Sequence, residues 1–205
     1  MSKDVESSDL QLRLLKSKVT YNEKFTLSGL ELVIKNLETY EEYLKVRPLV
    51  EQVSRSHIYH SKEYVDNMLS NPLFYPFLIL LESTNKSDST NKSDLTDESD
   101  STNKSDLTDE SDSLVNDLEA VGYFEIYLMP HLGRLFDSRL ERVIVDPQYR
   151  NKGIFTHMLS FIIDFCKSTL KCNRIDLTSN NPVAERVYKS FKFDPVDTNT
   201  YRIYL

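Results

Sequence analysis

The chain has 205 residues, of which 40% are hydrophobic, and its formal net charge is −7. This length is enough for one domain with a buried core, and no run of about 18 apolar residues marks a membrane span. The first residues also lack the basic and then apolar pattern of a secretory signal.

Residue types that form metal sites, disulfides or nucleic-acid surfaces are sparse. The two cysteines, Cys166 and Cys172, lack zinc-type spacing and favour reduced thiols in a cytoplasmic protein. The four histidines, at positions 57, 60, 131 and 157, show no ligand or catalytic-triad spacing. No basic stripe indicates a nucleic-acid surface. Together with the absence of metal-type spacing and of an apolar span, this predicts no metal, nucleic-acid or membrane partner.

The chain begins with a polar leader and a first strand. Residues 1–24 are polar and mixed and predict a partly ordered leader, after which residues 25–205 are predicted to form one domain. Residues 25–36 predict a hairpin-like entry into a strand at 30–34, because apolar and β-branched side chains gather there.

Two helices and a second strand are predicted next. Apolar residues near helical spacing predict a helix from Leu37 to Val53, which Pro48 can break or kink. Ser61 is suited to cap a second, short helix that ends at Asn71. The continuous apolar run at 73–81 predicts the second strand.

Composition changes abruptly at residues 83–112, which repeat the letters STNKSD and STNKSDLTDESD. This tract holds nine acidic residues and three lysines, so it carries −6 of the net charge of −7. Without aromatic residues it cannot bury enough apolar surface to offset its ordering entropy. The sequence therefore predicts a disordered, acidic, low-complexity insertion at 83–113. An acidic interaction segment or a phosphorylation target is the alternative.

The stretch from Leu140 to Phe155 predicts a buried strand, a turn and the start of a helix. Its first residues are apolar and mostly β-branched, and Asp146-Pro147 ends the strand. Gly153 stands at the mouth of the helix, where bare backbone N–H groups meet the positive end of the helix dipole and form a seat for a phosphate or pyrophosphate. The stretch has neither the P-loop pattern nor the dinucleotide-binding glycine pattern.

The remaining elements complete the sheet. Residues 118–128 alternate as a third strand, and residues 174–178 predict a strand after the helix that follows Gly153. A further helix is predicted from Pro182 to Phe191, and residues 198–205 predict a closing strand. The order predicts an α/β domain of the mixed α+β kind, with a central, mostly antiparallel mixed sheet flanked by helices.

Two sequence blocks resemble signatures of the GNAT acetyltransferase superfamily. Residues 144–153, IVDPQYRNKG, resemble V-x-[DN]-P-x-[YF]-[RQ]-x-x-G, and residues 181–193, NPVAERVYKSFKF, resemble N-x-x-A-x-x-[LV]-Y-x-x-x-G-F. Both blocks occur in the family's order and separation. The chain departs from the pattern at Phe155, where members usually have Gly or Ala, and at Lys192, where they have Gly.

This resemblance implies a cleft for acetyl-CoA where two central strands splay apart. The pantetheine arm is then expected to pair with the main chain of Val143, Ile144 and Val145, and with the side chain of Asn181. The pyrophosphate is expected at the main-chain N–H groups of six consecutive residues: Arg150, Asn151, Lys152, Gly153, Ile154 and Phe155.

The resemblance also implies direct attack of an amine on the thioester in a ternary complex. Tyr188 is the candidate general acid that protonates the departing thiolate and binds next to the CoA sulfur. Glu141 is the candidate that takes the amine proton or holds the ammonium, and Glu125 is a weaker candidate base. The alternatives are a core tyrosine at Tyr188 and, for Glu141, a surface strand residue paired with Arg139 or Arg142.

The layout is similar to that of small glucosamine-6-phosphate N-acetyltransferases, which implies an amino sugar phosphate as acceptor and a homodimer. D-glucosamine 6-phosphate, a precursor in UDP-N-acetylglucosamine synthesis, would then contact Glu141, Arg142, Thr178 and Arg134, with Arg139 as another candidate for the phosphate. Two other functions stay open. One is a protein lysine or N-terminal acetyltransferase, and the other is a non-catalytic acyl-CoA-binding regulator.

Overall fold

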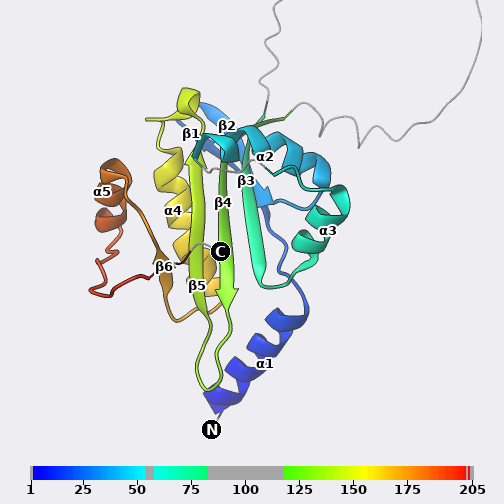
Figure 1. The fold of residues 1–205 in the computed structure, drawn as a ribbon, viewed down its shortest axis with the longest axis vertical. Coiled ribbons are helices and arrows are strands. Elements are labelled where there is room, and N and C mark those ends of the chain that lie inside the picture. The colour runs from blue at the N-terminus through cyan, green and yellow to red at the C-terminus, as the bar shows by residue number, and fades with distance from the viewer. Residues whose placement is uncertain (1, 54–57, 83–117, 202, 204–205) are drawn as a thin grey trace, which may run out of the picture.

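The computed structural model describes residues 2–53, 58–82, 118–201 and 203, and a six-stranded sheet forms its centre (Figure 1). The strands neighbour one another in chain order, and all pairs are antiparallel except the last, which is parallel. The predicted mixed, mostly antiparallel sheet flanked by helices is therefore confirmed. Its strands are β1 (Asn22–Leu27), β2 (Leu30–Asn36), β3 (Phe74–Leu81), β4 (Glu119–Met129), β5 (Asp137–Val145) and β6 (Ile175–Leu177).

The predicted hairpin joins β1 to β2. Its turn consists of Ser28 and Gly29, whose φ angles are 51° and 75°, and Leu27 pairs directly with Leu30. Positive φ at both central positions gives the two-residue turn whose twist matches that of a hairpin. The strand predicted at 30–34 thus lies within β2.

The segment predicted as a leader contains the helix α1 (Ser2–Lys16). It lies beside the turn between β4 and β5 (Figure 1), and the side chain of Leu14 is fully buried in the domain core. The predicted insertion at 83–113 lies outside the described residues. No helix in the described part is both long and apolar enough to cross a membrane.

Helices α2 (Tyr40–Val53) and α3 (Lys62–Ser70) cover one face of the sheet. α2 continues through Pro48 as one helix, so the predicted break does not occur. Ser61 caps α3 as predicted, because its hydroxyl accepts a hydrogen bond from the backbone N–H of Tyr64 at 3.2 Å. The buried side chains on this face are Val33, Leu37, Val46, Leu49, Val65, Leu69, Phe74, Leu78, Leu80, Tyr123 and Ile144.

Helix α4 (Ile154–Asp164) and the π-helical turn that follows it (Phe165–Thr169) pack on the opposite face. The rings of Phe77 and Phe124 stack 5.0 Å apart on the sheet, and the ring of Phe161 on α4 meets Phe77 edge-on at 5.2 Å. Cys166 and Cys172 beyond this helix are both free thiols.

Helix α5 (Pro182–Ser190) is the last regular element among the described residues. The predicted closing strand is wrong for residues 198–201 and 203, which form no strand, and the rest of that prediction lies outside the described residues. Tyr201 and Ile203 are 88% and 80% exposed. Alternating apolar residues form a strand only when a sheet edge pairs with them, and β6 offers an edge of three residues.

Candidate active site

The cleft lies where β5 and β6 separate. In the described part of the chain the two strands pair only from Ser138 with Ile175 to Leu140 with Leu177. A cavity of about 810 Å³ occupies the divergence. It brings together six residues that the sequence predicts for the site: Glu141, Arg142, Val143, Thr178, Asn181 and Tyr188.

A β-bulge shapes the β5 wall of this cleft. Tyr123 pairs with Ile144, and Glu125 pairs with Glu141, so two residues of β5 lie opposite Phe124 alone. One of these two, Arg142, has a φ angle of 50°. A bulge leaves its extra residue outside the ladder and re-aims the local main chain. Backbone groups next to the cleft are thereby released from pairing within the sheet.

The N-terminus of α4 is the place where the sequence predicts an anion seat. Gly153 caps the helix in the left-handed conformation, with a φ angle of 82°. Its carbonyl accepts from the N–H of His157 at 3.0 Å, which is the first bond of the helix, so the N–H groups of the intervening residues have no helical acceptor. The Ser28 hydroxyl binds the carbonyl of Lys152 at 3.0 Å and joins this loop to the β1–β2 turn.

Phe155, in the first turn of α4, packs its ring against Tyr188 of α5. The ring meets that of Tyr188 edge-on, with centroids 5.7 Å apart, and so fills the space between α4 and α5. Phe193 contacts the same tyrosine at 5.7 Å in a second edge-on pair. The bulky residue in place of the family's Gly or Ala therefore supports Tyr188.

Tyr188 and Asn181 come from α5. Tyr188 is 9% exposed, and burial raises the pKa of its phenol. Tyr188 lines the cleft, and within the described residues no group hydrogen-bonds to its hydroxyl. Asn181 caps α5, accepting from the N–H groups of Val183 at 2.9 Å and Ala184 at 3.4 Å, and its NH₂ group stays available for a ligand.

Glu141 takes part in a bridge across the mouth of the cleft. The Arg139 guanidinium donates to the Glu141 carboxylate at 2.7 Å and to the Thr178 hydroxyl at 2.5 Å. Arg139 lies on β5 and Thr178 follows β6, so this bridge spans the two diverging chains. The side chain of Glu141 remains 41% exposed, which leaves it accessible to a ligand.

Glu125 lies deeper in the same cleft and is 3% exposed. The Arg142 guanidinium donates to both of its oxygens, at 2.7 and 2.9 Å. The hydroxyls of Tyr123 and Tyr127 donate to it at 2.7 and 2.9 Å. Burial, together with this carboxylate, raises the pKa of both phenols.

The chain matches the model of a known protein family. Residues 78–193, more than half of the chain, match the model of the Acetyltransferase (GNAT) family. The chain belongs to this family. GNAT membership makes the protein an acetyltransferase and implies acetyl-CoA as the acetyl donor.

Solved structures show the same fold at low sequence identity. An aminoglycoside acetyltransferase from an uncultured soil metagenomic sample is 15% identical, with a TM-score of 0.59, over 85% of this chain and 95% of that one. Glucosamine-6-phosphate N-acetyltransferase from Arabidopsis thaliana is 14% identical, with a TM-score of 0.57, over 84% and 98%. Ribosomal-protein-alanine N-acetyltransferase from Brucella melitensis is 14% identical, with a TM-score of 0.52, over 84% and 99%.

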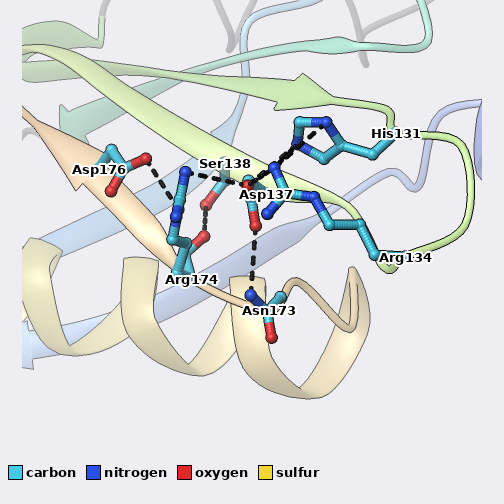
Figure 2. Close-up of polar contacts among 7 residues, drawn as sticks. All are labelled: His131, Arg134, Asp137, Ser138, Asn173, Arg174 and Asp176. Carbon is cyan, nitrogen blue, oxygen red and sulfur yellow. Dashed lines mark hydrogen bonds and ion pairs between the residues drawn. The ribbon is translucent and has the colours of Figure 1, made fainter.

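Arg134 is not among the residues that line the cleft between β5 and β6. Figure 2 shows it beside Asp137, where β5 begins, with its guanidinium 3.0 Å from the carboxylate. His131 and Arg174 contact the same carboxylate at 3.0 and 3.2 Å, and Asn173 donates to it at 3.4 Å. Asp137 is fully buried, so this cluster anchors the start of β5. In the described part of the chain no three side chains are grouped to hold a metal ion.

Proposed function

We propose that this GNAT acetyltransferase transfers an acetyl group from acetyl-CoA directly to a primary amine while both substrates are bound. One observation carries the proposal: the cleft between β5 and β6 brings the bulge of β5 together with Asn181 and Tyr188 of the α5 segment. Residues 150–155 would hold the diphosphate, and the main chain of residues 143–145 with the Asn181 amide would hold the pantetheine arm.

Two side chains would move protons during the reaction. The amine nitrogen bonds to the thioester carbon, the carbon–sulfur bond breaks, and the thiolate takes a proton from Tyr188. Glu141 would accept the proton that the attacking amine loses, directly or through water. Burial raises the pKa of Tyr188, so the phenol stays protonated at neutral pH and can act as a donor.

For the acceptor we favour D-glucosamine 6-phosphate, which carries an amine and a phosphate. The bridge at the cleft mouth supports this choice, because the Glu141 carboxylate suits an ammonium and the Arg139 guanidinium with Thr178 suits a phosphate. Arg142 is paired with the buried Glu125, and Arg134 lies outside the cleft lining beside Asp137. Arg139 is paired with the exposed Glu141 inside the cleft, so it is the better placed of the three arginines. A protein lysine or N-terminal amine is the second candidate acceptor, and a regulator that binds acyl-CoA without turnover is the third reading.

Calorimetry and a free-thiol release assay test the proposal together. We expect acetyl-CoA to bind, and CoA to be released with D-glucosamine 6-phosphate but not with D-glucose 6-phosphate, which lacks the amine. Turnover of lysine or N-terminal peptides in place of the amino sugar would assign a protein acceptor. Binding without turnover of any amine would indicate the regulator, and absence of acetyl-CoA binding would overturn the proposal.

A homodimer belongs to the same proposal. Val196, Tyr201 and Ile203, which follow α5, are 72%, 88% and 80% exposed and would be covered in a pair of chains. Light scattering of the full chain should then give twice the mass of one chain, and a chain shortened before Val196 should give the mass of one.

A further inference from the structure

Arg142 has a backbone conformation that its side chain does not favour. It lies within the bulge of β5 with a φ angle of 50°, in the left-handed region that glycine enters freely and other residues enter at a cost. Such conformations persist where the surroundings hold them in place.

The contact that holds Arg142 is an ion pair with Glu125 on the neighbouring strand. The Arg142 guanidinium donates to Oε1 at 2.7 Å and to Oε2 at 2.9 Å of a carboxylate that is 3% exposed. Glu125 is thus directly across the ladder from the bulge, where it pairs in register with Glu141. Removing one partner of an ion pair this deeply buried destabilises the folded protein, because the other charge is left buried and unpaired.

Glu125 has no acceptor position left for a substrate proton. Tyr123 donates to Oε1 and Tyr127 donates to Oε2, so each oxygen already accepts two hydrogen bonds. A carboxylate offers about four such positions. This arrangement suits a fixed anion that orients its neighbours, and it does not suit a base that must exchange protons in each turnover.

We propose that Glu125 is a positioning residue, which holds the Arg142 guanidinium and thereby fixes the left-handed bulge that aims the β5 main chain into the cleft. The inference rests on the proposed function, in which that main chain binds the thioester arm of acetyl-CoA. It assigns to Glu125 an indirect role, exerted through the backbone of residue 142. The exposed Glu141 remains the group that faces the amine.

Substitutions at residue 142 separate this backbone role from direct chemistry. Glycine adopts positive φ without help, whereas alanine does not and also lacks the guanidinium. We expect Arg142→Gly to bind acetyl-CoA within about twofold of wild type, and Arg142→Ala to bind about tenfold more weakly, as measured by calorimetry. Equal affinity of the two variants would overturn the inference.

A double-mutant cycle that combines Glu125→Gln with Arg142→Gly completes the test. Glu125→Gln alone should weaken acetyl-CoA binding about tenfold, and it should change affinity by less than about twofold when Arg142→Gly is already present. Glu82→Gln, which alters an acid paired with Lys24 outside the cleft, serves as the matched control and should bind as wild type does.

Two results would contradict the positioning role. One is an unchanged affinity in Glu125→Gln, and the other is an equal loss with and without Arg142→Gly, which would mean that Glu125 acts directly. Should Glu125→Gln fail to fold, the comparison of glycine with alanine at residue 142 still decides the matter. Failure of the wild-type protein to bind acetyl-CoA would instead overturn the proposed function, and this inference with it.

Discussion

At the residue scale, the phenol of Tyr188 is the most exacting test of the mechanism. Tyr188→Phe keeps the ring that packs on Phe155 and Phe193 and removes only the donor. We expect kcat to fall about 10²- to 10⁴-fold, the usual contribution of a general acid, while KM for acetyl-CoA stays close to that of wild type. Tyr149→Phe is the matched control, because that hydroxyl binds Glu119 and lies outside the cleft lining.

The pKa of Tyr188 also predicts the shape of the pH profile. Burial raises this pKa above the usual value for tyrosine, about 10, so the phenol stays protonated across the neutral and mildly alkaline range. The wild-type kcat should therefore show no fall that depends on Tyr188 between about pH 7 and pH 9. Such a fall in wild type, absent from Tyr188→Phe, would contradict the assignment.

His157 gives a separate pH prediction, for stability. It stacks on Phe25 with ring centroids 4.0 Å apart, and burial lowers its pKa, against a smaller opposing effect of Glu23. The folded state therefore holds this ring neutral, while the unfolded chain protonates it near pH 6.5. Its stabilising contribution is present above about pH 6.5 and is lost as the pH falls towards the folded-state pKa.

His157→Phe retains an aromatic ring against Phe25 and removes the titration. We expect the melting temperature to fall less between about pH 7.5 and pH 5.5 in this variant than in wild type, as measured by circular dichroism. Parallel falls in the two proteins would show that His157 does not set the acid sensitivity.

At the scale of elements, the end of α5 holds a residue other than glycine in the left-handed conformation. Lys192 has a φ angle of 65°, its N–H binds the carbonyl of Lys189 at 3.0 Å, and the N–H of Phe193 binds the carbonyl of Tyr188 at 3.1 Å. These two bonds and the contact between the rings of Phe193 and Tyr188 form a Schellman motif, whose left-handed position is usually glycine.

Lys192→Gly should therefore stabilise the protein by about 1 kcal/mol, because glycine adopts the left-handed conformation at no steric cost. Urea denaturation measures the difference. Lys192→Ala, which keeps a Cβ atom, should stay close to wild type, and a destabilised glycine variant would show that the lysine side chain contributes contacts of its own.

Local sequence pattern and two motif blocks were enough to place most helices and strands and to name several residues that line the candidate cleft. The apolar run at 73–81, the cap at Ser61 and the glycine at position 153 each act through neighbours in sequence, and the structure has the strand and the two helix starts. Asn181 and Tyr188 also line the cleft, and the motif at residues 181–193 was the only sequence signal that pointed to them.

Features that depend on pairing between strands were not predictable in this way. The ion pair of Glu125 with Arg142 requires the register of β4 on β5 and the bulge that shifts it, neither of which alternation of side chains reveals. The closing strand expected at 198–205 failed among its described residues for a related reason, since a strand needs an edge as well as a pattern. Arg134 was expected near the substrate because it is close in sequence to β5, and the buried Asp137 holds it instead.

At the scale of the whole molecule, the sheet separates two cores and places the cleft at one side. Helices α2 and α3 bury one face and α4 with α1 buries the other, so β3 and β4 are enclosed on both sides. The β5–β6 divergence lies beyond these central strands. The proposed chemistry is thus at the side of a sheet whose central strands are buried on both faces.

The connection between β3 and β4 provides the last prediction. Leu81 pairs with Glu119, so the two ends of this connection already lie side by side in the sheet. Deleting residues 83–112 leaves Glu82 and residues 113–118 between them, which is a short connection. Loop-closure entropy changes slowly with length, so the shorter chain should be as stable as wild type or up to ~2 kcal/mol more stable.

Activity should be unchanged by the same deletion, because residues 83–112 carry no part of the proposed chemistry and the cleft lies at the other side of β4. Thermal melting and the free-thiol release assay measure the two effects on the deleted chain. A variant that keeps the length but replaces the acidic residues of 83–112 by Asn and Gln separates charge from length. A large loss of activity in both variants would show that the acidic tract contributes to acetyl transfer.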